Sequence, residues 1–261
     1  VFTSDHGEGL NDHGIAAIAM AEAYSLTKDP RLRPVVDRVV GFTIRAQNPK
    51  TGGWRYKPYE ENGYRDRGDM SVTGWQIMAL KSAQFGGIDV PLESLDKALK
   101  YMDSIGGGKR KSIYGYTSKG NPKPAMVSEG MFCHQLLRQH AIDQHSASPQ
   151  DINLRLEESS KYIEKNLPTP RRLKYNYYYW YYACLALHQQ QGPIWESWNA
   201  RMRPVFLKAQ VKRPGQAALH GSWDPIGEWG PQAGRCIITG MATLSLEVYY
   251  RYLPMYNPNQ D

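Results

Sequence analysis

The sequence predicts an all-α protein in which buried helices alternate with half-buried helices. Five segments are rich in small and apolar residues on nearly every side, as is typical of buried helices. Four segments between them carry apolar residues on one face only. Strand signals are sparse, and residues 113–116 are the only short candidate. One helical hairpin cannot bury its apolar face alone, so neighbouring hairpins must complete it.

The five apolar segments recur at regular intervals along the chain. Aligning Ala21, Ala79, Gln135, Ala186 and Ser245 gives steps of 58, 56, 51 and 59 residues. The segments are residues 15–21, 72–80, 129–137, 180–187 and 240–246. This repetition predicts an α/α toroid, or part of one, with five inner and four outer helices. An ordinary helical bundle is the alternative.

The four amphipathic segments are the expected outer helices. In the first, Leu32, Val35, Val36, Val39 and Val40 follow the i, i+3, i+4 spacing of one helix face. The others are residues 92–102, 152–163 and 195–209. Pro and Gly mark the connections, and none of these is long enough to be a linker. We therefore expect one domain over residues 1–261.

Composition narrows the classes of function. The net charge is +7, and short basic clusters such as Lys109–Lys111 are typical of solvated loops, with an anionic surface as partner left as the alternative. We expect no nucleic-acid partner and, without an apolar run of 18 residues, no membrane span. Cys133, Cys184 and Cys236 are odd in number and form no Cys-x-x-Cys pair, so we expect reduced, mostly buried thiols and no disulfide framework. The sequence does not indicate a compartment.

Two turns carry a resemblance to a known family. Gln47 followed by Gly52-Gly53-Trp54, and Gln210 followed by Gly221-Ser222-Trp223, resemble the Gln…Gly-x-Trp repeat of squalene–hopene cyclases and related terpenoid cyclases. Residues 69–76, 178–183 and 246–254 resemble bacterial prenyltransferase/squalene-oxidase-repeat proteins. The resemblance implies an α/α toroid, whose closed form has about six inner helices. It therefore implies that this chain is the C-terminal part of a longer protein with upstream repeats. We expect Trp54 and Trp223 to be structural.

The motifs that carry chemistry in this superfamily are incomplete here. The cyclase acid motif is Asp-x-Asp-Asp, and the nearest match is residues 66–69, which lack the paired central aspartates. Asp69 is therefore expected to cap a helix, with the role of catalytic acid as the alternative. The prenyltransferase zinc ligands need an Asp-x-Cys pair, which does not occur, and Cys133 and His134 point about 100° apart on one helix. We expect no metal and no cofactor.

Polar residues near the starts of the inner helices suggest a ligand site. There, free N–H groups, a cationic side chain and aromatic rings would face one mouth, which suits an anionic or polyhydroxylated ligand. Three function classes remain: a repeat scaffold that binds a peptide, protein or small molecule in its central cavity, an isoprenoid cyclase or prenyltransferase-type enzyme, and a polysaccharide-active toroid enzyme. The candidate residues are Asp69 and His13 for catalysis, and Tyr56, Tyr178, Trp180 and Arg235 for ligand binding. The alternative is that these side chains pack against neighbouring helices.

Overall fold

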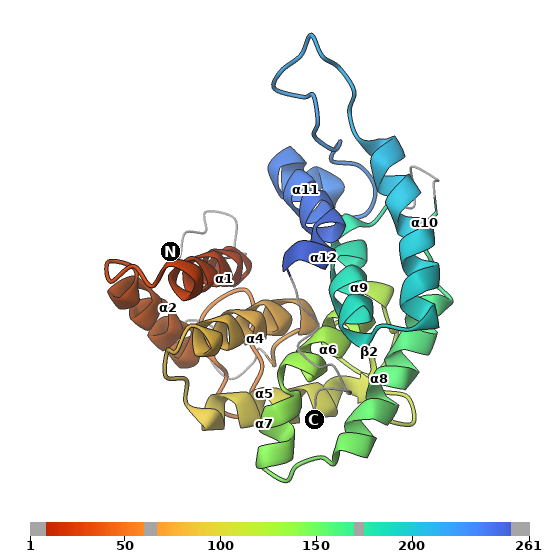
Figure 1. The fold of residues 1–261 in the computed structure, drawn as a ribbon. Coiled ribbons are helices and arrows are strands. Elements are labelled where there is room, and N and C mark those ends of the chain that lie inside the picture. The colour runs from red at the N-terminus through yellow and green to blue at the C-terminus, as the bar shows by residue number, and fades with distance from the viewer. Residues whose placement is uncertain (1–8, 60–66, 170–174, 252–261) are drawn as a thin grey trace.

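The structure is a computed structural model that describes residues 9–59, 67–169 and 175–251. Over this part of the chain the protein is predominantly helical, and the only sheet has two short strands (Figure 1). The prediction of an all-α protein is confirmed.

Five helices cover the apolar segments and pack against one another in chain order. They are α1 (Gly9–Thr27), α4 (Met70–Phe85), α6 (Pro124–Leu136), α9 (Tyr177–Gln190) and α11 (Gly230–Leu246). Helix α1 packs on α4, α4 on α6, α6 on α9 and α9 on α11 (Figure 1). The three middle helices are buried on nearly every side, as their small and apolar residues require.

Four helices cover the amphipathic segments and bury one face each. They are α2 (Arg33–Ala46), α5 (Leu92–Ile105), α8 (Pro149–Glu164) and α10 (Pro193–Ala209). Helix α2 packs on α1 and α4, α5 on α4, α8 on α6 and α9, and α10 on α9. In α2 the buried side chains include Val36, Val39 and Val40, which belong to the stripe expected from the sequence.

Smaller elements were not resolved by the sequence pattern. Strand β1 (Gly106–Gly107) pairs antiparallel with β2 (Ile113–Tyr114), in the segment that carried the only strand signal. Helix α7 (Arg138–Asp143) follows α6 after a break at Leu137, and α12 (Val248–Arg251) follows α11. The loop between α10 and α11 projects away from the helices (Figure 1).

The two Gln…Gly-x-Trp segments are turns that fasten the end of one helix to the start of a later one. We call Gln47–Trp54 the first Trp turn and Gln210–Trp223 the second. The indole Nε1 of Trp54 donates to the carbonyl of Thr43 at 2.8 Å, and that of Trp223 donates to the carbonyl of Phe206 at 2.8 Å. Both indoles are buried. The structural role expected of both tryptophans is confirmed.

The cysteines are free, but one of them differs from expectation. Cys133 and Cys184 are buried in α6 and α9, whereas Cys236 is exposed on α11. Two of the three thiols are thus buried as expected, and Cys236 is the exception, although the sequence places it in an apolar run. None of the described helices has the length and apolar character to cross a membrane.

Candidate functional site

Glu129 lies at the junction of three buried helices and has no exposed surface. It stands in the second turn of α6, where Tyr178 of α9 donates its hydroxyl to the carboxylate at 3.0 and 3.2 Å. On the α4 side, a Cβ built at Gly74 would lie 2.2 Å from Oε1, so the glycine leaves the room that the Glu129 side chain fills. Burial raises the pKa of Glu129 well above its ordinary value, and the phenols of Tyr182 and Tyr178 offset this only in part. Burial therefore favours the protonated form of this acid.

Four aromatic rings pack together beside this acid. Trp75 of α4 stacks on Tyr181 at 6.1 Å and meets Tyr182 at 5.3 Å between ring centroids. Tyr178 makes edge contacts with Trp75 and with Tyr182. We call Trp75, Tyr178, Tyr181 and Tyr182 the aromatic cluster. It joins α4 to α9 and buries the acid between them.

Asp69 caps the start of α4 and is fully buried. Its Oδ1 accepts the backbone N–H of Val72 at 2.9 Å and the hydroxyl of Ser71 at 2.6 Å. Its Oδ2 accepts a guanidinium N–H of Arg55 at 2.8 Å. Burial raises the pKa of Asp69, and the bonds from Ser71, Val72 and Arg55 work against that rise. The expectation of a helix cap is confirmed.

Tyr56 belongs to the same group of contacts as Asp69. The Arg55 guanidinium lies 4.7 Å from the ring centre of Tyr56 and 5.1 Å from that of Tyr116, and the two phenols bond to each other. Burial is also the largest cause that raises the pKa of Tyr116. The negative charge of Asp69 contributes to the raised pKa of Glu129. Asp69 and Tyr56 are thus joined through Arg55 at the start of α4. Tyr178 bonds to Glu129, which lies near enough to Asp69 to be affected by its charge.

The other three candidates are engaged elsewhere. His13 bonds through Nε2 to the Thr43 hydroxyl at 2.9 Å and packs its ring on Phe42, so it joins α1 to α2. Trp180 packs on Phe206 of α10 and on nearby tyrosines, and it is nearly fully buried.

Arg235 lies at the second Trp turn. Its guanidinium donates to Asp224 Oδ1 at 2.6 Å and to the Ser222 hydroxyl at 2.8 Å. The expected single mouth with all six candidates around it is therefore not what the structure assembles. His13, Trp180 and Arg235 each make contacts between neighbouring elements instead. Packing of this kind is the alternative that the sequence left open. Their catalytic and ligand-binding roles remain predictions.

The sequence analysis selected neither Glu129 nor Arg55. The signal for Glu129 is a single charged residue within an apolar, glycine-containing helix. Such a residue is rare in a core without partners, and here the partners are tyrosines of another helix. Arg55 gives no signal, because only the folded chain brings residue 55 to residue 69.

No cluster of three or more His, Cys, Asp or Glu side chains suited to a metal ion occurs among the described residues. Asp66, part of the nearest match to the cyclase motif, lies outside them. Comparison with protein families finds no matching family model, and no curated protein matches the chain.

Proposed function

We propose that this chain is a binding domain with the α/α-toroid architecture of terpenoid cyclases and prenyltransferase/squalene-oxidase-repeat proteins, in which the central acids hold helices together instead of performing catalysis. The observation that carries the proposal is the state of those acids. Asp69 and Glu129 are both 0% exposed, and both are bonded to groups from other segments of the chain. A general acid has to reach its substrate, and neither carboxyl group has exposed surface from which to do so.

The arrangement of helices supports the toroid. In this proposal α1, α4, α6, α9 and α11 are the five inner helices, and α2, α5, α8 and α10 are the four outer helices. The order of packing supports this assignment, because each inner helix contacts the next inner helix along the chain. Helices α2, α8 and α10 each contact the inner helix before them and the inner helix after them in sequence, and α5 contacts the one before it. The two Trp turns are a second argument, since the same fastening recurs at two widely separated outer-helix ends.

The two ends of this arc support a further repeat beside the chain. In α1, Ala19 is exposed and Ile15 and Met20 are partly exposed, and in α11 Ile237 and Gly240 are exposed. Helix α1 contacts α2 and α4, and α11 contacts α9, α10 and α12, so within the described chain neither end helix has a neighbour beyond it. Apolar faces of this kind are covered in a complete assembly. Upstream repeats of a longer protein are the occupant that the family resemblance implies.

One observation favours an isoprenoid enzyme as the second candidate. Burial raises the pKa of Glu129 and so favours its neutral acid form, and the aromatic cluster beside it is the kind of surface that stabilises a cation. The tight approach of Gly74 argues against it, because the space at Oε1 is already occupied by α4.

The test is to incubate the purified domain with squalene and with geranylgeranyl diphosphate, and to analyse the products by gas chromatography and mass spectrometry. We expect no conversion. Glu129→Gln keeps the shape of the side chain and should leave the circular dichroism spectrum unchanged. Conversion by the wild type that disappears in Glu129→Gln would show that the acid is catalytic and would overturn the proposed function.

A further inference from the structure

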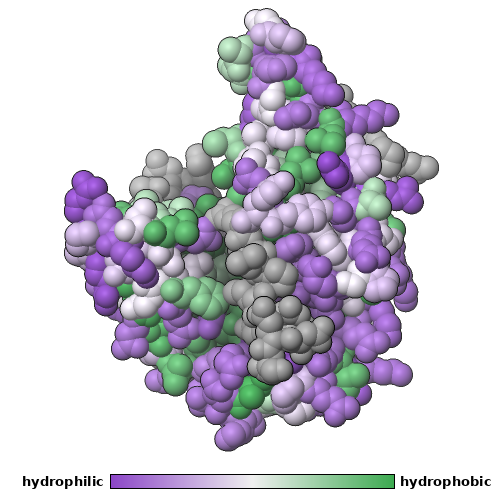
Figure 2. Space-filling model, in the orientation of Figure 1, coloured by the Kyte–Doolittle hydropathy of each residue, from purple (hydrophilic) through white to green (hydrophobic). Residues whose placement is uncertain are grey.

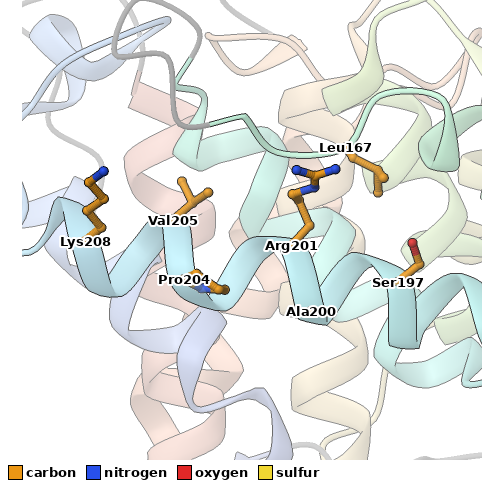
Figure 3. Close-up of a pocket in the computed structure, with 7 residues that line it drawn as sticks. All are labelled: Leu167, Ser197, Ala200, Arg201, Pro204, Val205 and Lys208. Carbon is orange, nitrogen blue, oxygen red and sulfur yellow. The ribbon is translucent and has the colours of Figure 1, made fainter.

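A groove lies on the exposed side of α10, away from the central acids. Its volume is about 490 Å³, within the range of ligand sites in general. Leu167, Ala200, Pro204 and Val205 supply an apolar floor. Figure 3 shows Arg201, Val205 and Lys208 rising from the same side of α10, with Leu167 of the facing loop beside Arg201.

The groove carries positive charge that the described chain does not neutralise. Arg201 and Lys208 are exposed, seven residues apart, and therefore stand about 10 Å apart along the helix axis. Neither is paired with an acid in the part of the chain that the structure describes. Lys212 and Arg213 follow in the projecting loop and also lack an acidic partner there. Figure 2 shows that this loop is covered largely by hydrophilic residues.

Pro204 interrupts the helical hydrogen bonding of α10 beside the groove. Pro204 lies inside α10 and has no N–H, so the carbonyl of Ala200, four residues earlier, lacks its usual helical donor. Both residues line the groove. An anion cannot satisfy a carbonyl oxygen, but the N–H of a peptide can.

We propose that this groove docks an acidic protein segment, with carboxylates on Arg201 and Lys208, an apolar side chain on the floor between Leu167 and Val205, and a backbone N–H on the Ala200 carbonyl. A phosphodiester or a lipid headgroup would satisfy the two cations and leave both the carbonyl and the floor unused. The inference rests on the proposed function, for which it names a partner class and a docking surface.

The experiment selects a phage-displayed library of random twelve-residue peptides on the immobilised domain and measures the affinity of the recovered peptides by fluorescence anisotropy. We expect sequences enriched in Asp and Glu around one or two large apolar residues. Arg201→Ser with Lys208→Ser should weaken their binding about 2- to 30-fold, since each exposed ion pair contributes about 0.2–1 kcal/mol. The matched control is Lys109→Ser with Arg110→Ser, which removes two exposed cations from another loop and should leave the affinity unchanged.

A third variant separates docking from stability. Pro204→Ala restores an N–H that bonds the Ala200 carbonyl, so peptide binding should weaken while the melting temperature stays the same or rises. Acid-poor peptides, wild-type affinity in the Arg201/Lys208 variant, or wild-type affinity in Pro204→Ala would each overturn the docking geometry. Tighter binding to phosphatidylserine vesicles than to any peptide, lost in the Arg201/Lys208 variant, would make the surface a lipid site instead. These results are independent of isoprenoid conversion, so either proposal can fail alone.

Discussion

The two Trp turns perform the same task with the same bonds, although 163 residues separate Gln47 from Gln210. Gln47 donates its side-chain amide to the carbonyl of Gly52 at 2.8 Å, and Gln210 donates to that of Gly221 at 2.9 Å. In each turn the tryptophan indole bonds the carbonyl four residues before the glutamine. The backbone N–H of each tryptophan donates to a threonine hydroxyl of the next buried helix at 3.1 Å. One turn therefore fastens three segments of chain.

The surroundings of the two turns differ. Helix α5 covers the first turn, and Gln47 also exchanges hydrogen bonds with Ser94 of that helix at 2.7 and 2.9 Å. A Cβ at Gly52 would lie 2.0 Å from the carbonyl oxygen of Lys97, whereas a Cβ at Gly221 would meet nothing within 4 Å. The first turn is thus an interior joint, and the second lies at the end of the helical array.

Each turn has an ion pair, and the positions of the acid and the base are exchanged between the two turns. At the first turn the base, Arg55, follows the tryptophan, and the acid, Asp69, begins the helix. At the second turn the acid, Asp224, follows the tryptophan, and the base, Arg235, lies in α11 directly after Gly234, where the backbone leaves the helical conformation. Asp69 is 0% exposed, but Asp224 and Arg235 are 42% and 30% exposed. Because either sign fills the position, the shared role is to join turn and helix, and this supports a structural reading of Asp69.

The largest expected effect is the loss of a tryptophan. Trp54→Ala should lower the free energy of unfolding by about 3–5 kcal/mol, because a fully buried indole and its hydrogen bond disappear from a joint that cannot collapse. Trp223→Ala should cost less, since its turn has solvent on one side. Urea unfolding followed by circular dichroism measures both. Equal losses would show that α5 adds nothing to the first joint.

Exchanging the charges tests the polarity of the ion pair. Arg55→Asp with Asp69→Arg should destabilise the protein by about 3 kcal/mol, because it buries a cation at a helix start and removes the cap. Asp224→Arg with Arg235→Asp should change stability by less than about 1 kcal/mol, since that pair is partly exposed. Thermal unfolding of the two double variants is the measurement. If the exchange at residues 55 and 69 left the stability unchanged, the buried position 69 would accept either charge, and the prediction would be wrong.

The two turn glycines should respond unequally to the same substitution. Both have φ near +85°, so alanine is strained at either one by about 1 kcal/mol or more. Gly52→Ala adds a clash with the backbone of α5 and should cost about 2–3 kcal/mol in total. Gly221→Ala introduces only the strain of a positive φ, because its Cβ would meet no neighbouring atom within 4 Å. The difference between the two unfolding free energies measures the contact with α5, and no difference would remove α5 from the joint.

The last expected effect is a pH dependence of stability in the region of α4 and α6, which surround Glu129. The folded protein holds the proton of Glu129 above the unfolded pKa, so the unfolded chain binds fewer protons and stability falls as pH rises above about 4.5. The slope reaches about 1.4 kcal/mol per pH unit at most. Glu129→Gln should match the wild type near pH 4.5 and exceed it at pH 8.

Hydrogen exchange can locate this dependence. Amides of α4 and α6 should lose protection between pH 5 and pH 8, after correction for the intrinsic exchange rate, while amides of α11 should not. His134 provides the opposite sign on the same helix: burial lowers its pKa to about 4, so its contribution is lost as pH falls below about 6.5. A wild-type protein as stable at pH 8 as at pH 4.5, with no gain in Glu129→Gln, would contradict the neutral state of Glu129.

The sequence by itself determined which segments are helices and which faces of them are apolar. Apolar residues on all sides of residues 72–80 require a buried helix, and the stripe of Leu32, Val36 and Val40 requires a half-buried one, because the 3.6-residue period is local. The first Trp turn could be predicted for a similar reason, as Gly52 and Trp54 stand within eight residues of Ala46, where α2 ends. Asp69 as a helix cap was equally local.

The tertiary structure decided which side chains meet. His13, Trp180 and Arg235 start from comparable positions on their helices, yet each faces a different neighbour, because the rotation and tilt of packed helices depend on every contact at once. Glu129 became the central acid only when Gly74 let α4 approach and α9 supplied Tyr178. The exposure of Cys236 has the same origin, because the residues of α11 alone do not show which of its faces other helices cover. Burial of a site is a property of neighbours distant in sequence, and a local pattern cannot contain it.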